Sequence, residues 1–268
     1  MLASLALVSL LQAPTLGADG LALADARLTF GILGPTRTDA KVRPGDNLVL
    51  SFEIQGITPD AAGKAVYTTA VEVTDAAGKS LFRQEPRKLQ EFLALGGNTL
   101  SAFAHIDLGP DSPVGEYTLK VTVTDQTSSK TASITQKFEV LPKSFDIARI
   151  AISADGEGLV PISLLGVGQP YWVHAAVVGF ERAKDATKQP KVALQLRVLD
   201  ENGKPVAAEP FKGMIDKDIV ATTTTLPFRF FIPLNRPGKY WVEIAAMDGL
   251  KKGTTAVQKF PLTVLPVK

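Results

Sequence analysis

The two histidines of the chain, His105 and His174, are the residues best suited to acid–base or metal chemistry near neutral pH. Apolar residues alternate with polar ones around each of them, and this pattern places both side chains on the outward faces of predicted strands. Neither histidine has an evident acidic or histidine partner in the sequence around it. We therefore expect both to be surface residues, and we predict no catalytic, cofactor-binding or metal-binding residues.

Other motifs that could support catalysis are equally scarce. The segment Asp155-Gly-Glu-Gly158 has some likeness to a calcium loop, but it lacks the spaced acids and the final glutamate of an EF-hand. A polar turn is the expected structure there. No nucleophile elbow, zinc-protease motif or phosphate-binding loop occurs, and the absence of cysteine excludes thiolate catalysis and disulfides. We predict that the protein is not an enzyme and uses no cofactor.

Aromatic residues give the most informative surface signal. Trp172 and Phe231 should point outward from neighbouring strands, beside His174 and Arg229. These four residues form a possible interaction patch, since exposed aromatic residues often mark protein interfaces. A loop or the other domain could instead cover them. Trp241 should lie on the opposite sheet, so the two tryptophans would not form one flat platform for a sugar.

The bulk composition narrows the functional classes. The chain has 268 residues, 45% of them hydrophobic, which is enough for a buried core. Its 29 basic and 27 acidic residues give a net charge of +2, without the basic face of a nucleic-acid-binding protein. We expect no nucleic-acid partner.

The N-terminus has the features of an export signal. Residues 2–11 are a short apolar run, and Ala22-Leu-Ala24 fits the small-residue cleavage rule. We predict a signal peptide over residues 1–24, cleaved at a position within 18–24, and an exported protein. The alternative is an N-terminal core strand or helix. No second long apolar run follows, so we expect no membrane span in the mature chain.

The rest of the chain contains an internal repeat. Residues 113–125, PVGEYTLKVTVTD, are repeated as residues 236–248, RPGKYWVEIAAMD, and similar pairs continue on both sides of these segments at nearly constant spacing. We predict two tandem domains, over residues 25–142 and 143–268. The joint near residues 141–144 is short and lacks the Gly/Ser tract of a flexible linker.

Each repeat has the alternating pattern of half-buried strands. Comparison of the copies predicts which side chains face inward. In one pair of corresponding strands these are Leu48 and Tyr171 with every second residue after each, and in another pair they are Leu100 and Leu226 with every second residue after each. The best helical stretch, 87–95, predicts at most a turn or two inside a connection. About seven short strands per repeat favour an all-β fold of two antiparallel β-sandwiches.

Gly115-Glu-Tyr117 and Gly238-Lys-Tyr240 each precede an alternating apolar strand, and this resembles the F strand of immunoglobulin-like sandwiches. The resemblance implies that Tyr117 and Tyr240 form tyrosine corners. Residues 43–50, RPGDNLVL, are similar to the strand entry of macroglobulin-like and bacterial surface immunoglobulin-like domains, a class that also includes fibronectin III domains. The cysteines and the tryptophan of antibody domains are missing. The resemblance thus implies a bacterial secreted protein with tandem immunoglobulin-like domains.

Together these observations predict a non-catalytic exported protein that presents two immunoglobulin-like domains for protein–protein contacts at the cell envelope. Its partners would be envelope or extracellular proteins. The alternative is a carbohydrate-binding protein that uses outward aromatic residues of the second domain, with a glycan as partner. Glycan binding lost on Trp172→Ala would favour this alternative.

Overall fold

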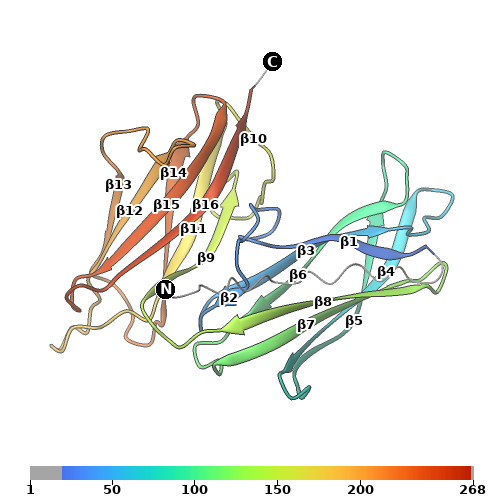
Figure 1. Cartoon of the computed structure of the whole chain (residues 1–268), viewed down its shortest axis with the longest axis horizontal. Helices are drawn as coiled ribbons and strands as arrows, with labels where there is room; N and C mark the ends of the chain where they lie inside the picture. The colour runs from blue at the N-terminus through green and yellow to red at the C-terminus, as the bar shows by residue number, and fades with distance from the viewer. Residues whose placement is uncertain (1–19, 267–268) are drawn as a thin grey trace, which may run out of the picture. The chain divides into compact units, whose positions relative to one another are not determined.

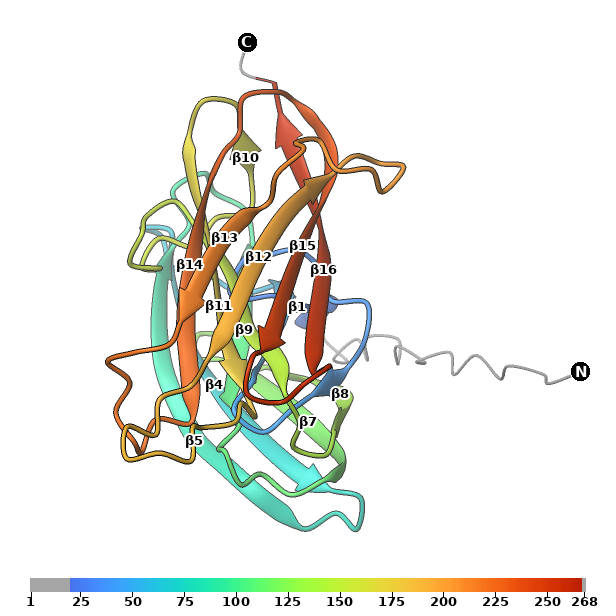
Figure 2. The ribbon, with the colours of Figure 1, turned by 90° about the vertical axis from the view of Figure 1, so that its left-hand side faces the viewer.

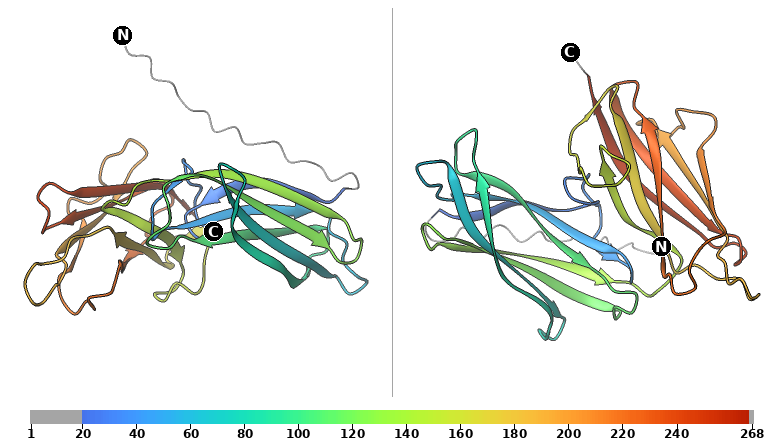
Figure 3. Two further views of the ribbon diagram at one scale, coloured as in Figure 1. Left: turned by 90° about the horizontal axis from the view of Figure 1, so that it is seen from below. Right: turned by 180° about the vertical axis from the view of Figure 1, so that it is seen from behind.

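The structure is a computed structural model that describes residues 20–266. Most of the predicted signal peptide, residues 1–19, lies outside the described residues. The described chain consists of strands joined by turns and loops, without a helix (Figures 1 and 3). This confirms the predicted all-β fold class with two tandem immunoglobulin-like β-sandwiches.

The first repeat forms two sheets. Their strand orders are β1-β3-β6 and β2-β8-β7-β4-β5. The strands are β1 (Ala22–Thr29), β2 (Lys41–Val42), β3 (Asn47–Gln55), β4 (Lys64–Asp75), β5 (Ser80–Phe92), β6 (Thr99–Asp107), β7 (Gly115–Asp125) and β8 (Thr131–Val140).

The second repeat forms the same two sheets. Their orders are β14-β11-β9 and β10-β16-β15-β12-β13, and Figure 2 shows β13, β12, β15 and β16 side by side. The strands are β9 (Asp146–Ser153), β10 (Leu165–Gly166), β11 (Pro170–Val178), β12 (Val192–Leu199), β13 (Phe211–Ile215), β14 (Thr225–Pro233), β15 (Gly238–Asp248) and β16 (Thr255–Leu265). Each strand of the first repeat corresponds to the strand numbered eight higher in the second, as β1 does to β9. The two repeats therefore share one topology.

Two details differ from the predicted sandwich. Each repeat has eight strands rather than about seven, and the pairing is not wholly antiparallel. The additional strands, β2 and β10, have two residues each and pair in parallel with β8 and β16, as in Lys41 opposite Glu139. Two residues are too few to produce a period-2 pattern, so periodicity alone cannot detect such strands.

The described chain packs into two compact units that do not follow the repeat. One comprises residues 20–26, 52–102 and 116–138, and the other comprises 27–51, 103–115 and 139–266. The second unit therefore includes residues 27–51 of the first repeat together with the whole second repeat. The predicted domain boundary at residues 142/143 stays a prediction.

The core of the second unit consists of inward side chains from both sheets of the second repeat. Strand β11 contributes Tyr171 and every second residue after it, and β14 contributes Leu226, Phe230 and Ile232. Phe30, from the first repeat, joins this core, with its ring centroid 5.7 Å from that of Phe260. The buried positions match the registers predicted from comparison of the two copies.

The short helical stretch expected within residues 87–95 is absent. Strand β5 extends through this region to Phe92, and its pairing with β4 runs from Ser80 opposite Thr74 to Phe92 opposite Lys64. The pairing of this thirteen-residue strand with its neighbour outweighs the weak local preference of these residues for helix.

A glycine ends the second long strand of each repeat and permits a close chain crossing. Gly56 has φ +76°, and a Cβ there would lie 2.0 Å from the carbonyl oxygen of Gly20. Gly179 has φ +66°, and a Cβ there would lie 2.1 Å from the carbonyl oxygen of Ser144. Both glycines are thus required by backbone packing as well as by their conformation.

Candidate interaction surface

The predicted patch residues lie together on two paired strands. In the antiparallel pair β11–β14, Trp172 is opposite Phe231 and His174 is opposite Arg229. These residues alternate with buried neighbours such as Val173 and Phe230, so their side chains project from the outer face of the sheet. We call Trp172, His174, Arg229 and Phe231 the aromatic patch.

The aromatic patch has a defined internal geometry. The ring centroids of Trp172 and Phe231 are 5.3 Å apart with planes inclined at 50°, and the Arg229 guanidinium carbon lies 5.4 Å from the Trp172 ring centroid. Phe231 is 41% exposed and Arg229 is also exposed, whereas Trp172 is half-buried. The surface therefore offers one open ring and one cation, supported by a second ring that both of them contact.

A loop from the same repeat covers part of the patch. An Arg229 nitrogen donates to the carbonyl oxygen of Gly156 and forms an ion pair with Glu157 at 3.3 Å. A Cβ at Gly156 would lie 3.4 Å from the Trp172 ring. The sequence left open whether a loop would cover these residues. A loop does so in part, because it packs on Trp172 and leaves Phe231 accessible.

Asp155 holds this loop in shape. Its carboxylate accepts hydrogen bonds from the backbone N–H groups of Glu157, Leu159 and Val160, at 2.8 to 3.1 Å. The bond from Val160 is the largest of the effects that lower the pKa of Asp155. The carboxylate therefore accepts hydrogen bonds from the backbone of the turn itself, and this confirms the polar turn predicted here.

His174 is less exposed than predicted. Its Nε2 lies 2.7 Å from the buried Ser153 Oγ, and a Cβ at Gly158 would lie 3.5 Å from the imidazole. Because the Ser153 hydroxyl donates to the carbonyl oxygen of Asp155 at 2.6 Å, Nε2 of His174 must be the donor toward Ser153. The prediction of a plain surface residue is wrong in this respect: the register is right, but the turn at 155–158 covers the ring. His105 is exposed and lies 3.6 Å from Asp107.

The two predicted tyrosine corners differ in exposure. Tyr117 is buried, and its ring stacks on Phe138 with 5.4 Å between centroids. Tyr240 is half-buried, and its Oη lies 3.4 Å from the Arg236 carbonyl oxygen and 3.3 Å from that of Pro237. The hydroxyl of Tyr240 therefore reaches the backbone just upstream, as a tyrosine corner does.

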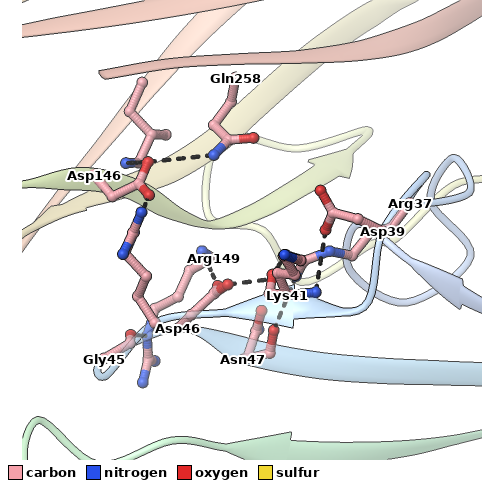
Figure 4. A network of polar contacts seen from close by, with 11 residues as sticks. Arg37, Asp39, Lys41, Gly45, Asp46, Asn47, Asp146, Arg149 and Gln258 are labelled. Atoms are coloured by element: carbon pink, nitrogen blue, oxygen red, sulfur yellow. Dashed lines mark hydrogen bonds and ion pairs between the residues drawn. The ribbon is translucent and has the colours of Figure 1, made fainter. Parts of the chain in front are cut away.

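The structure also contains a polar network that the sequence did not predict (Figure 4). Asp46, 6% exposed, accepts a hydrogen bond from the Arg149 backbone N–H at 2.7 Å and one from Arg37 Nη1 at 3.4 Å. Arg149 Nε donates to the Gly45 carbonyl oxygen at 2.7 Å. Arg149 has φ +54° at a bulge in β9, so the network holds a non-glycine residue in the left-handed region.

A second pair extends the network. Arg43 contacts the Asp146 carboxylate and donates to the Pro142 carbonyl oxygen at 2.8 Å, and Gln258 Nε2 donates to Asp146 Oδ1 at 3.2 Å. All of these residues belong to the second compact unit. The network therefore joins residues 37–47 of the first repeat to β9 and β16 of the second. The sequence analysis identified residues 43–50 as similar to a strand entry, but nothing in the repeat indicated the partners of Asp46.

The described residues show no cluster of three or more histidine, cysteine, aspartate or glutamate side chains suited to a metal ion. Within residues 20–266, no helix is long and apolar enough to cross a membrane.

Comparisons with known proteins identify no family. No protein-family model and no curated protein sequence matches the chain. Among solved structures, it is similar to a Bacteroides fragilis protein described as a candidate β-galactosidase, at 14% identity and TM-score 0.34, over 85% of this chain and 34% of that one. The chain thus corresponds to about a third of that protein's length.

Two further similarities involve C-terminal domains of streptococcal proteins described as antigen I/II-family or AgI/II. The C-terminal domain of the antigen I/II-family protein AspA of Streptococcus pyogenes matches at 10% identity and TM-score 0.29, over 89% of this chain and 98% of that one. The C-terminal domain of the AgI/II polypeptide BspA of Streptococcus agalactiae matches at 8% identity and TM-score 0.30, over 89% and 99%.

Proposed function

We propose that this chain is a non-catalytic, exported structural or interaction protein, which presents immunoglobulin-like domains for protein–protein contacts at the cell envelope. The observation that carries the proposal is the aromatic patch, where Phe231 and Arg229 are open to solvent and both contact Trp172. A few residues provide most of the binding energy of a protein interface, and these are enriched in Trp, Tyr and Arg, while Phe is also enriched in interfaces.

The patch is also held in place before any partner binds. Paired strands fix the positions of Trp172 and Phe231, and Arg229 is tethered by Gly156 and Glu157. A surface ordered in advance loses less conformational entropy on binding than a mobile one. This supports a role in recognition for a group of residues that contributes little to the core.

The carbohydrate-binding alternative receives less support from the geometry. A sugar platform needs flat, accessible rings, but Trp172 is half-buried under the 155–158 turn and inclined at 50° to Phe231. Trp241 lies in the other sheet, with Lys259 Nζ 4.9 Å from its ring centroid. Protein contact is therefore the function that we propose for the patch.

A pull-down from the native envelope, followed by mass spectrometry, tests this proposal. We expect Phe231→Ser to remove a partner that the unchanged protein captures. Phe103→Ser is the matched control, because Phe103 is 47% exposed on β6, the strand of the first repeat that corresponds to β14. Equal capture by all three proteins would contradict the proposal, and so would polysaccharide binding lost on Trp172→Ala.

Export has its own test in the mature N-terminus. Leu21 and Leu23, at the start of the chain's first strand region, are 1% and 2% exposed. Cleavage after Ala24 would remove these two core side chains, at roughly 1.5–3 kcal/mol each. We therefore expect sequencing of the mature protein to find an N-terminus no later than Leu21. An intact Met1 on protein recovered from the cytoplasm would contradict export.

A further inference from the structure

The second repeat has a gap in its five-stranded sheet where two prolines interrupt the hairpin between β12 and β13. Residues Val192 to Leu196 pair with β13, but past Leu196 the pairing is reduced to a single bridge between Leu199 and Pro205. Two backbone hydrogen bonds accompany it, from Val206 N–H to the Val198 carbonyl oxygen at 3.0 Å and from Asp200 N–H to that of Lys204 at 2.8 Å. Pro205 and Pro210 have no N–H group to donate to a ladder, so a regular strand resumes only at Phe211.

This detour leaves a cavity of about 470 Å³ between the 205–210 segment and the end of β14. Its volume lies within the range of sites that bind small molecules, about 300–1,000 Å³. The walls are mainly apolar and include inward-facing core residues of both sheets. The core residues are Leu196, Ile232 and Leu234, with Val198 partly buried. The apolar wall also includes Val206 and Phe211, which are 47% and 40% exposed.

The charged side chains that line the cavity leave an excess of positive charge. Glu209 accepts a hydrogen bond from Lys212 Nζ at 2.9 Å, and this bond is the largest of the effects that lower its pKa. Glu209 therefore already has a cationic partner. Arg236 Nε donates to Tyr240 Oη at 3.3 Å, and Arg236 and Arg197 form no ion pair among the residues that the structure describes. The charge of Arg197 also acts on Glu209 and lowers its pKa, so Arg236 is the guanidinium group that remains to bind an anion.

A partner strand is not a suitable occupant, although β13 and β14 are both edge strands. Strand β14 contains Pro227 and Pro233, which remove two N–H groups from a nine-residue strand. Proline on an edge strand is a common protection against strand addition. The cavity therefore suits a compact ligand better than an extended peptide.

We propose that this cavity binds a small amphipathic anion, with an apolar body against the apolar wall and an acidic group, such as a carboxylate or sulfonate, at Arg236. The site is separate from the aromatic patch, so either proposal can fail alone.

Fluorescence titration with 1-anilinonaphthalene-8-sulfonate, compared with its uncharged relative N-phenyl-1-naphthylamine, tests the proposal. We expect one saturable site for the sulfonate on the folded full chain. Ala207→Trp fills the cavity and should weaken both probes at least tenfold. Ala77→Trp, at an exposed turn residue of the first repeat, should leave both unchanged. Arg236→Gln should weaken the sulfonate about tenfold and the uncharged probe less than twofold.

Val206→Trp, at a lining residue that is 47% exposed, is a second cavity-filling variant in case Ala207→Trp does not fold. Near-ultraviolet circular dichroism establishes that each variant is native. No saturable binding to the folded chain, or unchanged binding by both filled variants, would overturn the site. Equal loss of both probes in Arg236→Gln would overturn the assignment of an anionic ligand.

Discussion

The hairpins β4–β5 and β12–β13 begin with the same turn and then diverge. Asp75 Oδ1 accepts the N–H groups of the residues two and four positions later, and Asp200 does the same, all four bonds at 2.9 Å. After the turn, Ser80 starts a strand of thirteen residues, whereas Pro205 delays a strand of only five. The shared turn fixes where the chain reverses, and the residue that follows it determines whether the sheet continues.

The two outcomes protect the edge of the sheet in different ways. Strand β5 is long, but it carries several charged side chains and has Pro86 near an irregularity in its pairing with β4, between Thr69 and Val71. Strand β13 is short, and the preceding segment leaves the sheet. Charge, proline and bulges discourage pairing with another chain, and so does a short edge. The departure of the segment before β13 from the sheet also creates a cavity.

The strand-end glycines provide the largest test of what the repeats share. Gly56→Ala and Gly179→Ala each place a Cβ about 2 Å from a carbonyl oxygen at positive φ, so each should cost at least about 3 kcal/mol. Gly203→Ala is the control, since nothing lies within 4 Å of its Cβ position, and it should cost about 1 kcal/mol of strain.

Chemical denaturation measures these differences. Both tryptophans lie in the second repeat, so tryptophan fluorescence reports on that repeat and far-ultraviolet circular dichroism on both. If the loss of stability is small at only one of the two strand-end glycines, the repeats do not share the close chain crossing at this position.

Buried aspartates at the ends of β7 and β15 give the next largest effect. Asp125 accepts from the Thr58 and Thr127 N–H groups at 3.0 and 2.9 Å, and Asp248 accepts from Glu181 and Leu250 at 2.8 and 2.9 Å. We expect Asp125→Ala and Asp248→Ala each to cost about 1–3 kcal/mol, because main-chain donors lose their acceptor. Denaturant midpoints measure the loss, and Asp200→Ala, at an exposed turn, should cost less.

Acid unfolding provides a pH test for Asp125. Burial raises its pKa, but hydrogen bonds from Ser128, Thr127 and Thr58 outweigh burial and lower the pKa in the folded state. The stability that this carboxylate contributes is therefore complete above its ordinary pKa, near 4, and is lost as the pH falls through the lower folded value. Asp125→Asn should reduce the pH dependence of stability below about pH 4. An unchanged slope would contradict the assignment.

The sequence was sufficient to predict features that occur in both copies. Comparison of the repeats gave the inward registers of β3, β6, β11 and β14, because a wrong register would have placed polar residues inside in both copies. It also placed Trp172 and Phe231 on the outward faces of neighbouring strands. The cover over His174 could not be predicted, since it depends on how a turn folds back across the sheet.

Features that occur in one copy were harder to predict. Asp46 and Arg149 are 103 positions apart, and no period or motif connects them. The cavity results from Pro205 and Pro210, which are visible in the sequence as breakers, but its volume depends on where the end of β14 lies. Contacts between distant segments depend on tertiary packing, and local patterns do not encode them.

A turn glycine tests this difference between copies. Gly45 and Gly168 precede β3 and β11 at corresponding positions, and both have positive φ. A Cβ at Gly45 would lie 2.9 Å from Val178 Cγ1, whereas nothing lies within 4 Å at Gly168. Gly45→Ala should therefore cost about 1 kcal/mol more than Gly168→Ala, because the Val178 side chain must move. Equal denaturant midpoints for the two variants would show that the contact with Val178 contributes nothing.

The tyrosine corners give the smallest expected effect. The contacts of Tyr240 Oη with the backbone oxygens of Arg236 and Pro237 are 3.3 to 3.4 Å long, so Tyr240→Phe should cost only about 0.5–1 kcal/mol. Tyr117→Phe should cost about 1 kcal/mol if the buried Tyr117 hydroxyl also bonds to the backbone. Denaturant midpoints measure both changes. If neither variant loses stability, the two repeats do not share a tyrosine corner. A loss at Tyr117 alone would instead show that the open cavity beside Tyr240 lets water replace the lost bond.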